Sequence, residues 1–327
     1  CEQRLVEIPP EDEAAIYGGK LTAYNFMKNR IDNLDITPAQ LALDPCNASC
    51  VITDVNTGDV LAMVSYPGYD NNKMANSIDA EYYAKLTTDK SNPQYNFATQ
   101  YKAAPGSTFK MVTATAGLME NVITLNGKVN CIGTFTEITP SPRCWRRSGH
   151  GYETVTTAIR DSCNYFFYNV GYQLSTRSGS YNETEGLNTL YEYAEMFGLA
   201  DKSGVEISEA VPNVSEKDPG TNSFTTVGLA RYVAAVANGG TCYNLTLLDK
   251  ITDSEGNLIR EIEPDVRNVI EIPQDYWNAL HSGMRQVVQN KSYFNELSVN
   301  VAGKTGTAEQ TKSRPNHALF VCYAPYE

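Results

Sequence analysis

Three short motifs lie in a fixed order along this chain of 327 residues, and each contains residue types that acyl transfer requires. They are Ser107-Thr108-Phe109-Lys110, Ser162-Cys163-Asn164 and Lys304-Thr305-Gly306-Thr307. A serine, a lysine and a glycine-containing strand supply a nucleophile, a base and a surface that binds an electrophile. Each motif alone occurs by chance, but the three in this order predict acyl-transfer chemistry on a serine.

The first motif is predicted to begin a buried helix. Pro105-Gly106 is a turn signal, and a run of small and apolar residues then continues to Gly117. Ser107 should therefore lie at the helix N-terminus, where free backbone N–H groups and the helix dipole stabilise a developing oxyanion. Lys110 follows three residues later, so its side chain should return to the face that carries Ser107.

The base for this serine is predicted to be a lysine. The three histidines, His150, His281 and His317, are in no recognisable Ser/His/acid arrangement. Lys110 must then be held neutral, and both burial and a nearby cation such as Lys304 would lower its pKa. The alternative interpretation of the motif is a helix-capping serine followed by a surface lysine.

The second motif precedes an aromatic run, which predicts a loop tip backed by a core helix. Ser162 is suited to relay a proton between Lys110 and a leaving amine, and Asn164 is suited to donate to an amide carbonyl of the substrate. The alternative is a simple helix cap before a core segment.

The third motif ends a predicted strand that begins at Val299. Gly306 indicates a place where a ligand or another backbone approaches closely. Lys304, Thr305 and Thr307 would hold a substrate carboxylate, and the N–H groups of Thr307 and Ser107 would form an oxyanion hole. The alternative is an ordinary strand with a basic start.

With these motifs, the chain resembles the transpeptidase domain of class B penicillin-binding proteins, most closely the elongation-type and sporulation-type members. The resemblance covers nearly the whole chain from about Cys46 onward. Further stretches that carry it are residues 51–65, Gly220-Thr221-Asn222-Ser223-Phe224-Thr225 and Leu229-Ala230-Arg231-Tyr232-Val233-Ala234.

The resemblance implies an activity and assigns roles by motif. The nucleophilic serine would be Ser107 and the base Lys110, with Ser162 and Asn164 shuttling protons and positioning substrate. Lys304 and Thr305, with Gly306 and Thr307 in the same strand, would bind the substrate. The implied reaction is attack on the D-Ala-D-Ala bond of a peptidoglycan stem peptide, loss of D-Ala, and transfer to an amine of a neighbouring strand. No cofactor is expected for catalysis, and acylation by β-lactams is implied.

The resemblance also implies a setting for the domain. Family members act at the extracytoplasmic face of the bacterial membrane, on lipid-linked nascent glycan, beside a membrane glycosyltransferase of the elongation or sporulation machinery. They carry an N-terminal transmembrane anchor, and this chain contains no run of about 18 apolar residues. Two departures are apparent. Asp218-Pro219-Gly220 looks like a shortened junction, and the chain stops at Glu327, where the family continues with another strand and a packing helix.

Composition and patterning predict an α+β fold, with helices packed on an antiparallel sheet. Residues 1–45 are predicted to be an N-terminal helical or linker segment, and residues 46–327 the catalytic domain. The net charge of −12 argues against nucleic-acid binding. The expected elements are a hairpin over 51–66, helices over 14–31, 191–197, 226–237 and 276–288, paired strands within 245–262, and a strand over 317–323 paired with 299–307.

Four ligand-type residues predict a metal site; three lie between the first two motifs and the fourth, Cys163, lies inside the second. Cys131, Cys144, His150 and Cys163 are spaced as C-x12-C-x5-H-x12-C, and three thiolates with one imidazole suit tetrahedral Zn²⁺. Related elongation-type enzymes carry cysteine or acidic ligands and a histidine at similar spacing. The zinc would be structural. The alternative is a Cys131–Cys144 disulfide with a buried free Cys163 and a loop histidine. Cys242 and Cys322 are expected in the core.

Other functions that share the acylation step remain open at this point. A D,D-carboxypeptidase or a β-lactamase would use the same nucleophile, although no glutamate loop that would activate a deacylating water is recognisable. A β-lactam sensor would stay acylated and signal, but such domains are shorter and lack the context of the 51–66 hairpin. The sequence does not distinguish a role in growth from one in sporulation, and it does not identify the acceptor amine.

Overall fold

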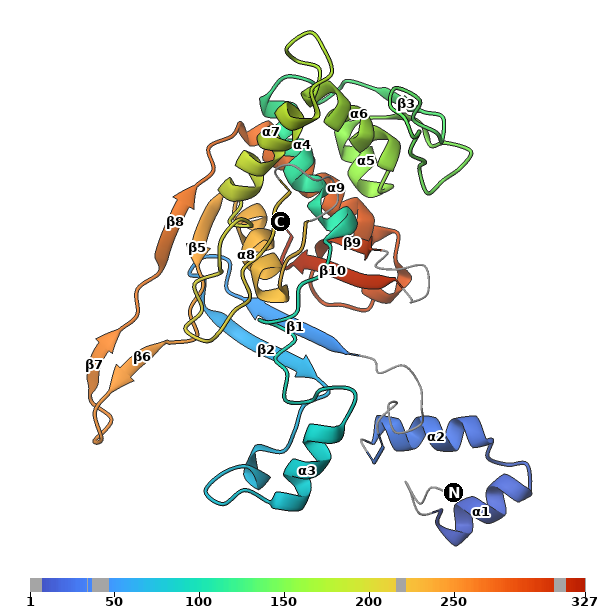
Figure 1. Cartoon of the computed structure of the whole chain (residues 1–327), viewed down its shortest axis with the longest axis vertical. Helices are drawn as coiled ribbons and strands as arrows, with labels where there is room; N and C mark the ends of the chain where they lie inside the picture. Colours follow the sequence, from blue (N-terminus) through green and yellow to red (C-terminus); the bar gives the residue numbers. More distant parts are fainter. Residues whose placement is uncertain (1–7, 34, 37–46, 216–221, 309–315, 327) are drawn as a thin grey trace. The chain divides into compact units, whose positions relative to one another are not determined.

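The computed structural model describes residues 8–33, 35–36, 47–215, 222–308 and 316–326 (Figure 1). The chain divides into two compact units, one made of residues 1–49 and 65–97 and the other of residues 50–64 and 98–327. The smaller unit therefore includes residues 65–97 in addition to the segment 1–45 that was predicted to be separate. Asp218-Pro219-Gly220, the predicted junction, lies outside the described residues, as does Cys46.

The smaller unit is helical. It contains α1 (Pro10–Tyr17), α2 (Ala23–Asp32), the 3-10 turn η2 (Asn71–Lys73) and α3 (Ala80–Thr88). The helical region predicted over 14–31 is two helices, because Gly18 and Gly19 interrupt it and Gly19 adopts a left-handed φ of 71°. Thr22 then caps α2 by accepting a hydrogen bond from the Asn25 N–H at 3.1 Å.

The strands of the described residues pair two by two. The pairs are β1 (Ala48–Thr53) with β2 (Val60–Tyr66), β3 (Val129–Cys131) with β4 (Gly151–Glu153), β5 (Thr241–Asn244) with β8 (Asp265–Val269), β6 (Lys250–Thr252) with β7 (Leu258–Glu261), and β9 (Ala302–Ala308) with β10 (His317–Tyr323). The last four pairs are antiparallel. In the β9–β10 pair, Ala308 lies opposite His317 and Lys304 opposite Val321.

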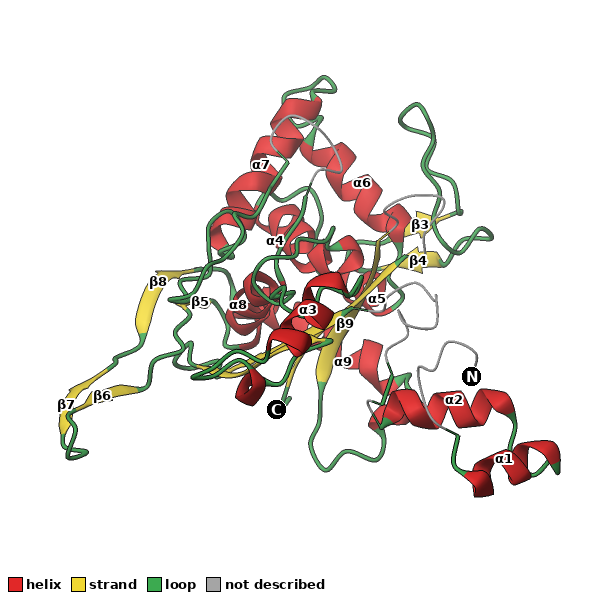
Figure 2. Cartoon of the chain, turned by 60° about the horizontal axis from the view of Figure 1, so that its bottom comes forward, coloured by secondary structure: helices red, strands yellow, loops and turns green. Residues whose placement is uncertain are grey.

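The helices of the larger unit surround one central helix (Figures 1 and 2). They are α4 (Lys110–Met119), α5 (Val155–Arg160), α6 (Asn164–Leu174), α7 (Glu183–Met196), α8 (Thr226–Ala237) and α9 (Gln274–Gln289). Every residue of α4 except its last is buried, and α4 packs against α5, α6, α7 and α9. Helix α9 also packs on β9, and α8 packs on β10 and β5. The α+β class predicted from the sequence is confirmed.

Most predicted elements are found with shifted ends. Helix α8 matches its predicted range, whereas α7 begins eight residues earlier than predicted because Asn182 caps it. Cys242 is buried as expected, but the prediction for Cys322 is wrong. Cys322 is exposed, because successive residues of β10 face opposite sides and the adjacent Val321 faces the core. Among the described residues, no helix combines the length and the apolar composition that crossing a bilayer requires.

Candidate active site

The first motif forms a tight turn that leads into the central helix. Gly106–Phe109 is a 3-10 turn (η3), and α4 begins at Lys110. Two hydrogen bonds fix the turn: the Thr108 hydroxyl donates to the Pro105 carbonyl at 2.8 Å, and the buried Tyr232 hydroxyl donates to the Thr108 carbonyl at 3.0 Å. Ser107 is half-buried, and its hydroxyl has no hydrogen-bond partner within the described part of the chain. Its position at the start of a buried helix is as predicted.

The backbone of β9 lies directly against this turn. A Cβ atom added at Gly106 would come 2.6 Å from the Thr307 carbonyl oxygen, and one added at Gly306 would come 2.7 Å from the Pro105 carbonyl oxygen. Gly106 also has a φ of 53°, which other residues rarely adopt. The expected close approach at Gly306 is confirmed, and the approaching group is the turn that carries Ser107. The oxyanion hole formed by Ser107 and Thr307 stays a prediction.

The second motif lies in a sharp turn between α5 and α6. The turn is closed by hydrogen bonds from the Ser162 N–H to the Ile159 carbonyl at 3.2 Å and from the Cys163 N–H to the Ala158 carbonyl at 2.9 Å. Ser162 has a φ of 51°, a left-handed conformation that costs a non-glycine residue on the order of 1 kcal/mol. Asn164 is the first residue of α6. The prediction of a loop tip backed by a core helix is confirmed.

The three motifs meet at the Ser162 hydroxyl. Lys110 Nζ lies 3.0 Å from Ser162 Oγ, 2.8 Å from the Ser162 carbonyl oxygen and 2.7 Å from Asn164 Oδ1. Lys304 Nζ approaches the same Ser162 Oγ at 2.9 Å and the Thr305 carbonyl oxygen at 3.1 Å. Ser162 thus bridges two amines that are 194 positions apart in the sequence, a chain of contacts along which a proton can move.

Burial and like charge lower the pKa of both lysines. The side chain of Lys110 is 7% exposed, and its burial, together with the charge of Lys304, lowers its pKa to about 7. Charge on the nearby Cys163 and Cys144 acts in the opposite direction. Lys304 is fully buried, and burial together with the charge of Lys291 lowers its pKa to about 8. A substantial fraction of Lys110 is therefore neutral near pH 7, as a base for Ser107 requires.

The side chains of the third motif differ in their access to a substrate. Lys304 is fully buried and contacts Ser162, whereas Thr305 is half-buried and Thr307 is exposed. The two threonines are thus the members of the motif with side-chain surface available. A role for Lys304 in binding a substrate carboxylate stays a prediction.

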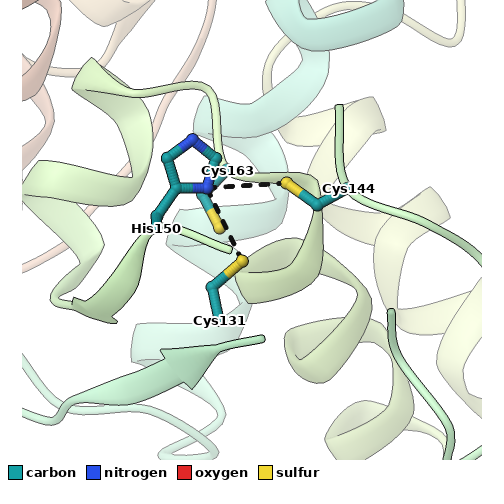
Figure 3. A group of neighbouring side chains, drawn as sticks. All are labelled: Cys131, Cys144, His150 and Cys163. Atoms are coloured by element: carbon teal, nitrogen blue, oxygen red, sulfur yellow. Dashed lines mark hydrogen bonds between the residues drawn. The ribbon is translucent and has the colours of Figure 1, made fainter. Parts of the chain in front are cut away.

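The four predicted metal ligands lie together (Figure 3). Their ligand atoms are all within 4.8 Å of one another, and no disulfide joins any of the described cysteines. His150 Nδ1 lies 3.5 Å from Cys131 Sγ and 3.6 Å from Cys144 Sγ. Cys163 caps α6, since its Sγ accepts a hydrogen bond from the Phe166 N–H at 3.5 Å. The cluster is therefore built into the turn that carries Ser162.

Two aromatic residues beside these groups were not predicted from the sequence. The Phe167 ring centroid lies 5.3 Å from Lys110 Nζ, so the ring shields the base from water and interacts with its charge. The Trp145 indole N–H donates to the carbonyl oxygens of Asp161 and Ser162. Phe167 follows the second motif closely in sequence, but nothing in the local pattern around Trp145 indicated its target.

Comparison with known proteins agrees with this geometry. The chain is 28% identical over 333 residues to the peptidoglycan D,D-transpeptidase MrdA of Haemophilus influenzae, an alignment that covers 87% of this chain and 48% of that relative. The chain thus spans about half the length of the curated relative.

Two solved structures with 28% identity are also similar. Penicillin-binding protein PBP2 of Pseudomonas aeruginosa, solved in complex with WCK 5153, matches with a TM-score of 0.73 over 85% of this chain and 66% of that chain. A peptidoglycan synthase complex, described as coordinating polymerization and crosslinking, matches with a TM-score of 0.74 over 85% of this chain and 49% of that chain. Residues 48–327 match the family described as the penicillin binding protein transpeptidase domain. The chain therefore belongs to the penicillin-binding protein transpeptidase family.

Proposed function

We propose that this domain is a serine D,D-transpeptidase that cross-links peptidoglycan stem peptides and is acylated by β-lactams. One observation carries the proposal. Lys110 is buried, has a pKa of about 7, and contacts both Ser162 and Asn164. The turn that carries Ser107 lies directly before Lys110 and against β9. Nucleophile, base and binding strand thus come from the three motifs that the family resemblance assigned.

The proposed reaction proceeds through an acyl-enzyme. Ser107 Oγ attacks the carbonyl carbon of the penultimate D-Ala while neutral Lys110 takes its proton, and the N–H groups of Ser107 and Thr307 stabilise the oxyanion. The peptide C–N bond then breaks, and the terminal D-Ala leaves with a proton that is passed from Lys110 through Ser162. An amine of a second strand attacks the ester, loses its proton to the same groups and restores the Ser107 hydroxyl.

The lifetime of a penicilloyl adduct separates this function from its alternatives. We expect a one-to-one adduct that persists for at least tens of minutes, together with release of D-Ala from a peptide ending in D-Ala-D-Ala. Intact mass spectrometry after dilution into penicillin-free buffer would measure the lifetime of the adduct, and a D-Ala assay would measure the release of D-Ala. Clearance within seconds to minutes would indicate a β-lactamase, whereas a stable adduct without any D-Ala release would indicate a sensor. Release of D-Ala without formation of a cross-linked product, even when an acceptor amine is added, would indicate a carboxypeptidase.

Acylation by penicillin should depend on pH through the two lysines. Below pH 7 the Lys110 base becomes protonated, so the acylation rate at pH 6 should fall to about one tenth of its limiting value. Above pH 8 Lys304 loses its positive charge and with it the proposed attraction for the penicillin carboxylate, so the rate should decline again. The rate constant, measured from pH 5.5 to 9 with the unfolding midpoint as a control for stability, should be greatest between about pH 7 and 8. A flat profile would contradict Lys110 as the base.

We also propose a structural Zn²⁺ at Cys131, Cys144, His150 and Cys163. A tetrahedral centre with Zn–S of about 2.3 Å and Zn–N of about 2.0 Å separates nitrogen and sulfur by roughly 3.5 Å. The two distances from His150 Nδ1, 3.5 and 3.6 Å, fit this separation. All four ligand positions would be filled by protein side chains, so the metal would cross-link loops and would take no part in acyl transfer. The close cysteine and histidine side chains favour zinc over the alternative of a single disulfide.

The setting of the domain is proposed from the family. The similar synthase complex, described as coordinating polymerization and crosslinking, supports a partner that polymerises glycan. The family resemblance further implies that this partner is a membrane glycosyltransferase acting on lipid-linked glycan, at the extracytoplasmic face of a bacterial membrane. The net charge of −12 gives no attraction to nucleic acid. An N-terminal anchor would hold the domain there. Growth and sporulation remain alternative roles of such an enzyme.

A further inference from the structure

The turn that carries Ser162 has carbonyl groups that its own backbone leaves without partners. The N–H groups of Ser162 and Cys163 bond back to α5, but no backbone N–H of the described residues bonds to the carbonyl oxygens of Asp161 or Ser162. Helix termini and tight turns generally need side-chain donors for such groups. The donors here come from two other parts of the chain, Lys110 and Trp145.

The single indole N–H of Trp145 donates to the carbonyl groups of both Asp161 and Ser162. Its Nε1 lies 3.0 Å from the Asp161 carbonyl oxygen and 3.1 Å from that of Ser162. The Ser162 carbonyl also accepts from Lys110 Nζ at 2.8 Å, so the indole and the proposed base share one acceptor. The indole is thus hydrogen-bonded to the backbone of Ser162, which has a left-handed φ and whose hydroxyl bridges Lys110 and Lys304.

Core packing does not account for the position of this indole. The Trp145 side chain is 59% exposed, and its ring meets the His150 ring edge to face at a centroid distance of 5.1 Å. Trp145 follows Cys144 directly in sequence, so its backbone is attached to a residue of the proposed zinc cluster. An exposed tryptophan fixed on one side by that cluster and bonded on the other to the turn is suited to hold the turn in place.

We infer that Trp145 is a positioning residue for acylation, which fixes the Ser162 turn so that the Ser162 hydroxyl stays between Lys110 and Lys304. The inference rests on the proposed acyl-enzyme function. Trp145 touches no reacting atom in this scheme and acts through the Ser162 backbone. A misplacement of catalytic groups by about 1 Å can lower a rate about a hundredfold, so loss of the indole N–H should be visible in the acylation step.

Trp145→Phe tests this, because phenylalanine keeps an aromatic ring beside His150 and removes the N–H donor. With a fluorescent penicillin, we expect the first-order acylation constant to fall about tenfold or more, while the dissociation constant of the preceding complex, the zinc content and the unfolding midpoint stay those of the wild type. Tyr152→Phe is the matched control, because Tyr152 lies on β4 and is 73% exposed. This variant should be acylated at the wild-type rate.

A double-mutant cycle shows whether Trp145 acts through Ser162. Trp145→Phe should change the acylation rate little in a Ser162→Ala background. If the two substitutions instead lowered the rate independently, their fold-reductions would multiply in the double variant, and this result would overturn the inference. Should Trp145→Phe lose zinc or unfold, Trp145→Leu, which also lacks a hydrogen-bond donor, replaces it in both experiments. A folded, zinc-containing variant that acylates at the wild-type rate would also overturn the inference. A wild-type chain that is not acylated at Ser107 would instead contradict the proposed function.

Discussion

Replacing Ser107 by alanine is expected to abolish the covalent penicillin adduct completely. The wild-type chain should gain one penicilloyl group, and the variant none, because the only other hydroxyl group of the η3 turn, on Thr108, is buried and donates to the Pro105 carbonyl. Loss of the nucleophile in a serine hydrolase costs about a 10⁶-fold reduction in rate, so no residual labelling should be detectable. Intact mass spectrometry of both proteins after the same incubation measures this directly.

The control for this experiment is Ser254→Ala, in the turn between β6 and β7. Ser254 is exposed and lies in a separate two-stranded ribbon, so this variant should be labelled like the wild type. The unfolding midpoint of Ser107→Ala should also match the wild type, because the Ser107 hydroxyl has no hydrogen-bond partner within the described part of the chain. Labelling of Ser107→Ala at one penicilloyl group per chain would show that another residue is the nucleophile.

Removing the proposed zinc should have the second largest effect. Structural zinc contributes apparent free energies of about 10 kcal/mol or more in small domains at pH 7. Cys163 belongs both to the ligand cluster and to the turn of Ser162. We therefore expect a strong chelator to lower the unfolding midpoint and to suppress penicillin acylation together, and added Zn²⁺ to restore both. Metal analysis of protein purified without chelator should find about one zinc per chain.

Variants at two cysteines make the zinc prediction specific. Cys144→Ala should lower zinc content, stability and acylation, whereas Cys242→Ala, at a buried thiol outside the cluster, should leave zinc content unchanged. Loss of stability in Cys242→Ala, if any, would reflect the core cavity that the substitution leaves. Protein with well under one zinc per chain and an intact Cys131–Cys144 disulfide would rule the metal site out.

The sequence predicted the local chemistry of the site well, because each motif is a contiguous stretch with its own structural signal. Pro105-Gly106 marked the turn before the buried helix, and the aromatic run after Asn164 marked a core helix. The spacing of the cysteines and His150 also identified side chains that the fold brings together. These signals depend on neighbouring residues and on simple periodicity, which the chain displays directly.

What the sequence did not predict depends on contacts between distant segments. Trp145 donates to carbonyl groups 16 and 17 positions away, and no pattern in its own segment indicates such a target. The full burial of Lys304 follows from packing around β9, while its motif indicated a lysine available to a substrate carboxylate. The break between α1 and α2 was missed because apolar residues continue on both sides of Gly18 and Gly19.

The contact between the Ser107 turn and β9 also limits how this chain can evolve under antibiotic selection. At Gly106 and Gly306 even a methyl group would collide with a backbone carbonyl of the opposing segment, so substitutions there would damage the site for peptide and inhibitor alike. Thr307 is exposed on the same strand and can vary in size without such a collision. Changes in inhibitor binding that leave the site folded should therefore arise at outward-facing side chains, and the two glycines should stay fixed under drug pressure.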